Sequence, residues 1–407
     1  MNRLKLSIMK RCLPLVLACM AMMQTAAAAD RLELQKDDHI CVIGNTLADR
    51  MQHSGWFESL IYTKLPKENL VFRNLGFSGD ELTVRLRSEG FGSPDEWLKK
   101  EKADVIFAFF GYDESFKGPE GLAAFRNDLE KFIADRRKQN YSGRGAPRLV
   151  LFSPISAEKH SDANFPDPAS INGNLKLYTD AMADVAKLNA VPFVNLFTLS
   201  QNAYAQVKQP LTINGVHLND EGYRVIAPLM FKALFGEAPP SATERGSFEE
   251  LRAAVNEKNA VWFSRYRTVD GYNVYGGRSF LKFDGVMNRD TMQREMEMRD
   301  VMTANRDKRV WAVAQGVDLK VEDKNLPPPI EVKSNKPGPN PDGAHEFLSG
   351  EAAIKRMKVP PGCKVNLFAS EEQFPELANP VQMAFDTRGR LWVAAWPNYP
   401  ERRPEST

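Results

Sequence analysis

Between residues 39 and 236, short apolar runs rich in β-branched residues alternate with longer stretches whose apolar residues recur at helical spacing. The short runs predict strands, and Ala103–Phe110 is almost continuously apolar, which is typical of a strand buried on both faces of a parallel sheet. The expected strands are His39–Ile43, Leu70–Gly76, Ala103–Phe110, Arg148–Phe152 and Val191–Phe197. The expected helices are Leu47–Leu65, about 119–140, about 172–189 and one that follows Gly222. This alternation predicts right-handed βαβ units, and therefore an α/β fold with helices on both faces of a parallel sheet.

Glycines mark the ends of the first three expected strands. Gly44, Gly76 and Gly111 each end or directly follow one of these apolar runs. In open α/β sheets, ligands bind outside the carboxyl ends of the strands. We therefore expect the functional residues in the turns that these glycines begin.

The composition narrows the class of protein. The chain has 407 residues, of which 43% are hydrophobic and 26% charged, as in ordinary globular proteins. The 54 Lys and Arg residues nearly balance 52 Asp and Glu residues, and no long run carries one sign, so we expect no nucleic-acid partner. The sequence contains no CxxCH motif for haem attachment. We expect neither a metal nor a cofactor.

Residues 1–29 have the pattern of a secretory signal peptide. Basic residues precede an apolar run, Cys12–Met23, and small residues lead up to Ala29. A membrane anchor is the alternative, but the run is short for a bilayer and no later segment is long and apolar enough to span one. We expect a secreted or periplasmic protein. After cleavage only Cys41 and Cys363 remain, so the protein is not a disulfide scaffold.

Four segments at the ends of expected elements resemble the sequence blocks of the SGNH (GDSL-type) hydrolase family. They are Gly44–Leu47, Asn74–Glu81, Gly111–Glu114 and Asn214–Tyr223. The resemblance covers about half of the chain, which we delimit as residues 30–240. It implies a flavodoxin-like, three-layer αβα fold and a hydrolase that acts on ester bonds.

The resemblance also implies a role for each matching residue. Thr46 stands at the position of the nucleophile, His217 at that of the general base, and Asn214 at that of the carboxylate that orients the histidine. The oxyanion hole would consist of the backbone N–H groups of Thr46 and Gly79 and the side chain of Asp113.

Three of these positions depart from the family pattern. Thr46 adds a methyl group at Cβ, which restricts its side chain. Asn214 cannot offset the charge of an imidazolium, although Asp220, three residues after His217, could supply a negative charge. Asp113 would repel an oxyanion unless it were protonated. Other roles therefore stay open: a helix N-cap for Thr46, a loop histidine for His217 and a turn residue for Asp113.

The rest of the chain divides into three expected parts. Residues 241–323 are a helical annex, and residues 324–343 a proline-rich linker. Residues 344–407 contain expected strands at Lys364–Ala369, in Val381–Arg390 and at Leu391–Trp396, and their pattern resembles the opening blade of a sorbosone-dehydrogenase-like β-propeller. One partial, truncated blade cannot close a propeller, so we expect either a fragment of a longer protein or a vestigial tail. The propeller resemblance implies no dehydrogenase activity and no quinone cofactor.

Two classes of function follow. The first is an exported SGNH-type esterase that uses a degenerate triad on a small-molecule or carbohydrate ester, with acylated carbohydrate as the expected substrate. The alternative is a catalytically inactive carbohydrate-binding or scaffold module that precedes a propeller domain.

Overall fold

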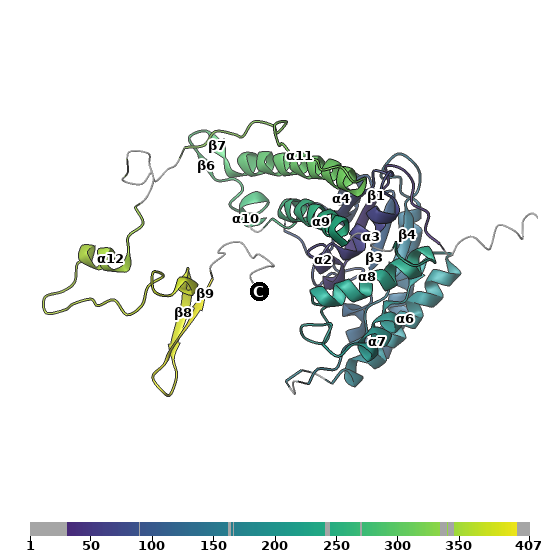
Figure 1. The fold of residues 1–407 in the computed structure, drawn as a ribbon, viewed down its shortest axis with the longest axis horizontal. Coiled ribbons are helices and arrows are strands. Elements are labelled where there is room, and N and C mark those ends of the chain that lie inside the picture. Colours follow the sequence, from purple (N-terminus) through teal and green to yellow (C-terminus); the bar gives the residue numbers. More distant parts are fainter. Residues whose placement is uncertain are drawn as a thin grey trace, which may run out of the picture. The chain divides into compact units, whose positions relative to one another are not determined.

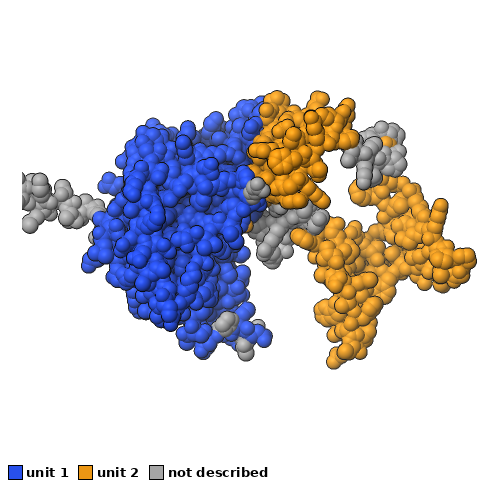
Figure 2. Space-filling model, turned by 180° about the vertical axis from the view of Figure 1, so that it is seen from behind, with its two compact units in different colours: residues 1–266, 296–327 blue, residues 267–295, 328–407 orange. Residues whose placement is uncertain are grey.

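The computed structural model describes the chain from residue 31 to residue 396. Within this range the residues not described are 89, 162–163, 166, 241–244, 269–270, 334–339 and 341–345. The expected signal peptide, residues 1–29, therefore lies outside the described residues. The chain forms two compact units: residues up to 266 with 296–327, and residues 267–295 with those from 328 onward (Figure 2).

The first unit is built on a parallel sheet of five strands. The strands are β1 (His39–Gly44), β2 (Val71–Asn74), β3 (Val105–Phe109), β4 (Arg148–Phe152) and β5 (Phe193–Val194). Their order in the sheet is β2-β1-β3-β4-β5, and all pairings are parallel. Figure 1 labels β1, β3 and β4 of this sheet. This is the flavodoxin-like order, in which β2 lies on one side of β1 and β3 on the other. The expected α/β fold with a parallel sheet is confirmed.

Helices cover both faces of this sheet. On one face, α3 (Trp56–Lys64) packs against α8 (Asp220–Phe235), and both share a core with Val105, Phe107 and Phe109 of β3. The alternate residues of β3 are equally buried and face the other side, as side chains alternate along a strand. There α5 (Gly118–Arg137) pairs with α6 (Ala169–Leu188). Burial on both faces explains why β3 is apolar along its whole length.

The single helix expected over Leu47–Leu65 is two helices in the structure. The first, α2 (Thr46–Met51), is separated from α3 by Gly55, whose φ of +67° is left-handed. A Cβ at this glycine would lie 2.3 Å from Asn256 Oδ1. Gly55 therefore allows both the turn and the close approach of the segment that carries Asn256.

Two further helices differ from the sequence expectation. The expected strand at Val191–Phe197 pairs over only two residues, because Asn195 caps α7 (Leu196–Gln206) by accepting from Thr198 N–H at 2.9 Å. Helix α4 (Pro94–Lys100) was not expected, although Ser93 and Glu96 form a capping box at its start. In both cases a polar side chain satisfies the free N–H groups of a first turn.

Long helices complete the first unit. Helix α9 (Arg245–Tyr266) and α11 (Asn288–Ala314), from Met296 onward, belong to the same compact unit as the sheet. A buried ion pair joins Arg73 of β2 to Asp307 of α11 at 2.6 Å, and Lys258 of α9 pairs with Glu58 of α3. Helices α9 and α11 thus contact the sheet and α3 through buried charges as well as apolar side chains.

The second unit contains short elements. They are α10 (Gly271–Val274), β6 (Lys282–Phe283), β7 (Val286–Met287), α12 (Gly350–Arg356), β8 (Pro380–Phe385) and β9 (Leu391–Ala395). Strands β8 and β9 form the expected hairpin, but the structure has no strand at Lys364–Ala369. A single hairpin does not identify a propeller, so the propeller start is not shown. In the described part of the chain, no helix has the length and apolar character needed to cross a bilayer.

Candidate active site

The turn after β1 places Thr46 at the carboxyl edge of the sheet. Gly44 has a φ of +129°, and a Cβ there would lie 2.0 Å from the carbonyl oxygen of Phe109, so only glycine fits beside β3. Asn45 is the N-cap of α2, because its Oδ1 accepts from Leu47 N–H at 3.2 Å. Thr46 is the first residue of that helix. The capping role considered for Thr46 therefore belongs to Asn45, and the Thr46 hydroxyl is not needed for it.

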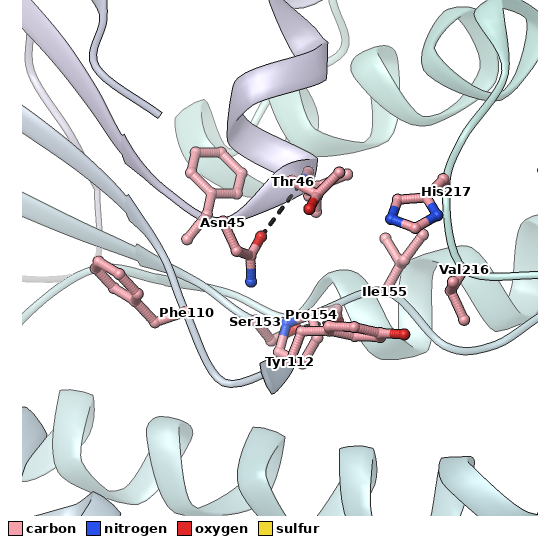
Figure 3. A pocket seen from close by; sticks show the side chains of 11 residues that line it. Asn45, Thr46, Phe110, Tyr112, Ser153, Pro154, Ile155, Val216 and His217 are labelled. Carbon is pink, nitrogen blue, oxygen red and sulfur yellow. Dashed lines mark hydrogen bonds between the residues drawn. The ribbon is translucent and has the colours of Figure 1, made fainter. Parts of the chain in front are cut away.

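Thr46 and His217 line the same pocket. Its walls come from the ends of β1, β3 and β4 and from the loop before α8, and most of them are apolar. Its lining residues are Asn45, Thr46, Leu47, Phe109, Phe110, Tyr112, Ser153, Pro154, Ile155, Val216 and His217. Figure 3 shows the side chains of Thr46 and His217 facing one another across this pocket. No hydrogen bond joins them, and such bonds often form only when a substrate is bound.

Asn214 fixes which nitrogen of His217 carries the proton. Asn214 Oδ1 accepts from the backbone N–H groups of Val216, at 3.3 Å, and His217, at 3.1 Å, and lies 3.0 Å from His217 Nδ1. The two backbone groups can only donate, so the atom that faces them is the amide oxygen. Nδ1 must therefore donate as well, and the lone pair of the neutral ring is on Nε2. Asn214 thus sets the tautomer that a general base requires.

Burial holds His217 in its neutral form. Desolvation lowers the pKa of His217 below its ordinary value, and the positive charge of Arg50 lowers it further. Asp220 is not among the groups that shift the pKa of His217, and its carboxylate accepts from the Trp56 indole at 3.2 Å. A neutral imidazole with Nε2 unprotonated can accept a proton at neutral pH.

Glu158 holds the loop that carries His217, a role the sequence analysis missed. Its buried carboxylate accepts from the N–H groups of Leu211, at 3.0 Å, and Thr212, at 2.8 Å, and from the Thr212 hydroxyl. Its own N–H donates to Gly215 O at 2.7 Å. Glu158 and the loop are more than 50 residues apart, so no local sequence signal pairs them.

Two backbone amides have the properties of oxyanion-hole donors. Among the described residues, neither the N–H of Thr46 nor that of Gly79 has an acceptor. Gly79 is exposed, has a φ of +83°, and has open space around the position of a Cβ. Its neighbour Ser78 is held by Asp49 Oδ2, which accepts from the Ser78 N–H at 3.1 Å and hydroxyl at 2.7 Å. Gly79 is not among the residues that line the pocket.

Asp113 is also absent from the pocket lining. It begins a short 3-10 helix, η1 (Asp113–Lys117), and one of its carboxylate oxygens is buried with no partner in the described chain. Burial raises the pKa of Asp113, and the nearby carboxylates of Glu81 and Asp80 raise it further. The next residue, Glu114, accepts from Gly111 N–H at 2.8 Å and Leu82 N–H at 2.7 Å and so fixes the turn.

Tyr112, the residue before Asp113, lines the pocket, whereas Asp113 does not. Burial and the charge of Asp113 raise the pKa of Tyr112, so its hydroxyl stays protonated and can donate. Figure 3 shows its ring along the pocket beneath Ile155. The family resemblance implied no role for Tyr112, because it stands at a position that the family block leaves open. The described residues contain no cluster of three or more His, Cys, Asp or Glu that could hold a metal ion.

Comparison with known proteins supports the family resemblance. Residues 44–225 match the GDSL-like Lipase/Acylhydrolase family, and residues 349–407 match a domain of unknown function (DUF7133). The second match does not show a sorbosone-dehydrogenase-like propeller. No curated protein matches the chain.

Several solved structures are similar to about half of the chain. An alpha/beta hydrolase enzyme from the metagenome of Lake Arreo, Spain, is 16% identical, with coverage of 50% of this chain and 97% of that one and a TM-score of 0.37. A variant acetyl xylan esterase from Geobacillus stearothermophilus is 13% identical (52% and 100% coverage, TM-score 0.39). A putative GDSL-like lipase from Parabacteroides merdae is 15% identical (50% and 98%, TM-score 0.38). The match over residues 44–225 supports a GDSL-like lipase/acylhydrolase family domain in this chain, and with it a hydrolase that acts on ester bonds.

Proposed function

We propose that the protein is an exported esterase that removes small acyl groups from carbohydrate through Thr46 and His217. The observation that carries this proposal is the contact between Asn214 Oδ1 and His217 Nδ1, 3.0 Å long, in a histidine that shares a pocket with Thr46. It leaves Nε2 as the basic atom. The carbohydrate and the export follow from the family resemblance and the expected signal peptide.

The proposed reaction has two steps. Thr46 Oγ1 attacks the ester carbonyl carbon and passes its proton to His217 Nε2, while the N–H groups of Thr46 and Gly79 stabilise the oxyanion. The alcohol then leaves with the proton from His217, and an acyl-Thr46 ester remains. In the second step a water attacks this ester, His217 takes the proton of the water and returns it to Thr46, and the carboxylic acid is released.

A binding or scaffold role is the second candidate. Two observations favour it: Asn214 supplies no charge to the imidazolium that the reaction forms, and Asp113 is absent from the pocket lining. A module of this kind would keep the pocket and bind a glycan without turning it over.

Hydrolysis of a short-chain chromogenic acetate by the full chain separates the two candidates. We expect turnover that is lost in His217→Ala and in Thr46→Ala. His53→Ala is the matched control, because His53 is exposed and outside the pocket, and it should keep the wild-type rate. Equal background hydrolysis by the wild type, His217→Ala and Thr46→Ala would refute the esterase. Glycan binding, measured by calorimetry, would then support the second candidate.

A further inference from the structure

Strand β2 is at the edge of the described sheet, and side chains donate to carbonyl groups at or beside its two ends. Edge strands leave such groups unpaired unless another element covers them. At the start of β2, Leu70 O accepts from Tyr62 OH at 2.9 Å and from Trp311 Nε1 at 2.7 Å. At its end, Asn74 O accepts from Trp262 Nε1 at 2.6 Å and Leu75 O from Tyr266 OH at 3.1 Å.

The two bonds at the end of β2 come from one helix. Trp262 and Tyr266 are four residues apart on α9, so they lie one above the other on the same face. Their rings stack with centroids 5.9 Å apart, and both side chains are buried. Trp97 packs edge-on against Tyr266 at 4.9 Å. This packing holds the phenol and the indole in place, so the two bonds fix Asn74 and Leu75 relative to α9.

Asn74 and Leu75 begin the segment that carries Gly79. Asn74 Oδ1 accepts from Gly76 N–H at 2.8 Å, and Asn74 Nδ2 donates to Ala48 O of α2 at 2.7 Å. Phe77 N–H donates to Gly44 O at 2.9 Å. These bonds tie the segment to the turn that carries Thr46, the other residue whose amide is unoccupied.

Through Arg87, Tyr266 also connects to the residue that follows Gly79. Arg87 forms two bonds of 2.8 Å with Asp80, the residue after Gly79, and interacts with the Tyr266 hydroxyl as well. The guanidinium of Arg87 covers the Phe77 ring at 4.0 Å. One phenol therefore connects to the segment both before and after Gly79.

We propose that Tyr266 and Trp262 are positioning residues for the oxyanion hole, and that α9 sets the place of the Gly79 amide relative to that of Thr46. The catalytic part of this inference rests on the proposed esterase function. Donors of an oxyanion hole act only when they lie about 2.7–3.1 Å from the oxygen that becomes charged. Because the two amides belong to different segments, their spacing depends on what fixes each segment. Asp49 and Gly44 hold the Gly79 segment on the side of Thr46, and α9 holds its start through Asn74 and Leu75.

Tyr266→Phe tests the proposal, with Tyr62→Phe as its matched control. Each change removes one hydroxyl that donates to a carbonyl directly beside β2, and each keeps the packed ring. Tyr62 lies at the opposite end of the strand from Gly79. We expect Tyr266→Phe to lower kcat about tenfold with an unchanged KM, less than the loss of a whole donor costs. Tyr62→Phe should keep the wild-type kcat, although both variants should unfold at a lower denaturant concentration.

Hydrogen–deuterium exchange of the peptide that spans residues 75–82 gives a second readout that needs no turnover. Exchange should be faster in Tyr266→Phe and unchanged in Tyr62→Phe. Equal exchange in the two variants would overturn the inference, as would equal kcat values in an active enzyme. The wild type and both variants could all fail to hydrolyse esters while exchange rises only in Tyr266→Phe. In that case the esterase proposal fails and the positioning of Gly79 by α9 stands.

Discussion

Replacing Asn214 by aspartate restores the charge that the candidate triad lacks. In the structure Asn214 already orients His217 correctly, because two backbone N–H groups hold its Oδ1 toward Nδ1. The Asn214→Asp variant therefore keeps the tautomer and adds only a negative charge beside the imidazolium. We expect kcat to rise.

The size of the rise follows from the charge alone. A hydrogen bond to a charged group contributes about 1.5–3 kcal/mol, against about 0.5–1.5 for a neutral one. A difference of about 1.4 kcal/mol is about tenfold in rate. Two unit charges about 4 Å apart at an effective dielectric of about 20 interact by about 4 kcal/mol, which sets an upper bound of about 10³-fold. In serine proteases, the established example, the reverse change from aspartate to asparagine costs about 10⁴ because the tautomer is also wrong.

Steady-state hydrolysis of a chromogenic acetate, measured across pH, checks this reasoning. The rate should rise about 10- to 10³-fold. The carboxylate stabilises the imidazolium and so raises the pKa of His217, which moves the acid limb of kcat/KM to higher pH. A gain near 10⁴ would show that wild-type His217 has the other tautomer. An unchanged rate, in an enzyme that still requires His217, would show that no charge develops on the ring.

Three further predictions concern single groups. Thr46→Ser should raise kcat, because it removes the Cβ methyl that restricts the hydroxyl and leaves the cap at the start of α2 intact; a lower rate would show that the methyl group is required. Arg50→Gln should raise the pKa of His217, because the cation that disfavours its protonation is gone. The acid limb of kcat/KM should therefore move to higher pH, and an unmoved limb would show that the charge of Arg50 does not act on His217. Asp307→Asn should lower the free energy of unfolding by about 3 kcal/mol, since it leaves Arg73 buried without its closest carboxylate; a denaturant titration measures this, and a loss under about 0.5 kcal/mol would contradict it.

The elements of the sheet were largely predictable from the sequence. The apolar run at Ala103–Phe110 identified β3, and Arg148–Phe152 has the predicted bounds of β4. Where the predicted bounds of a strand or helix were wrong, a local feature of the chain competes with the apolar pattern. Asn195 caps a helix directly after two strand residues, and Gly55 interrupts a stretch whose periodicity continues on both sides.

The candidate site was predictable as a set of residue types and less so as a geometry. The sequence pattern singled out Thr46, His217 and Asn214 at turns. In the structure Thr46 and His217 line one pocket, and Asn214 contacts His217. The sequence pattern could not show that Tyr112 lines the pocket in place of Asp113. Adjacent residues in a turn point in different directions, and the direction depends on the backbone geometry after β3.

The sequence by itself determined the α/β class, the order of the strands along the chain and the chemical groups at their ends. These depend on periodicity and residue type, which act over a few neighbouring positions. Only the tertiary structure decided the tautomer of His217 and the hydrogen bonds that α9 makes to Asn74 and Leu75. The bond between Trp262 and Asn74 joins residues 188 positions apart. Contacts at such separations depend on how the whole core packs, and no local pattern in the chain encodes them.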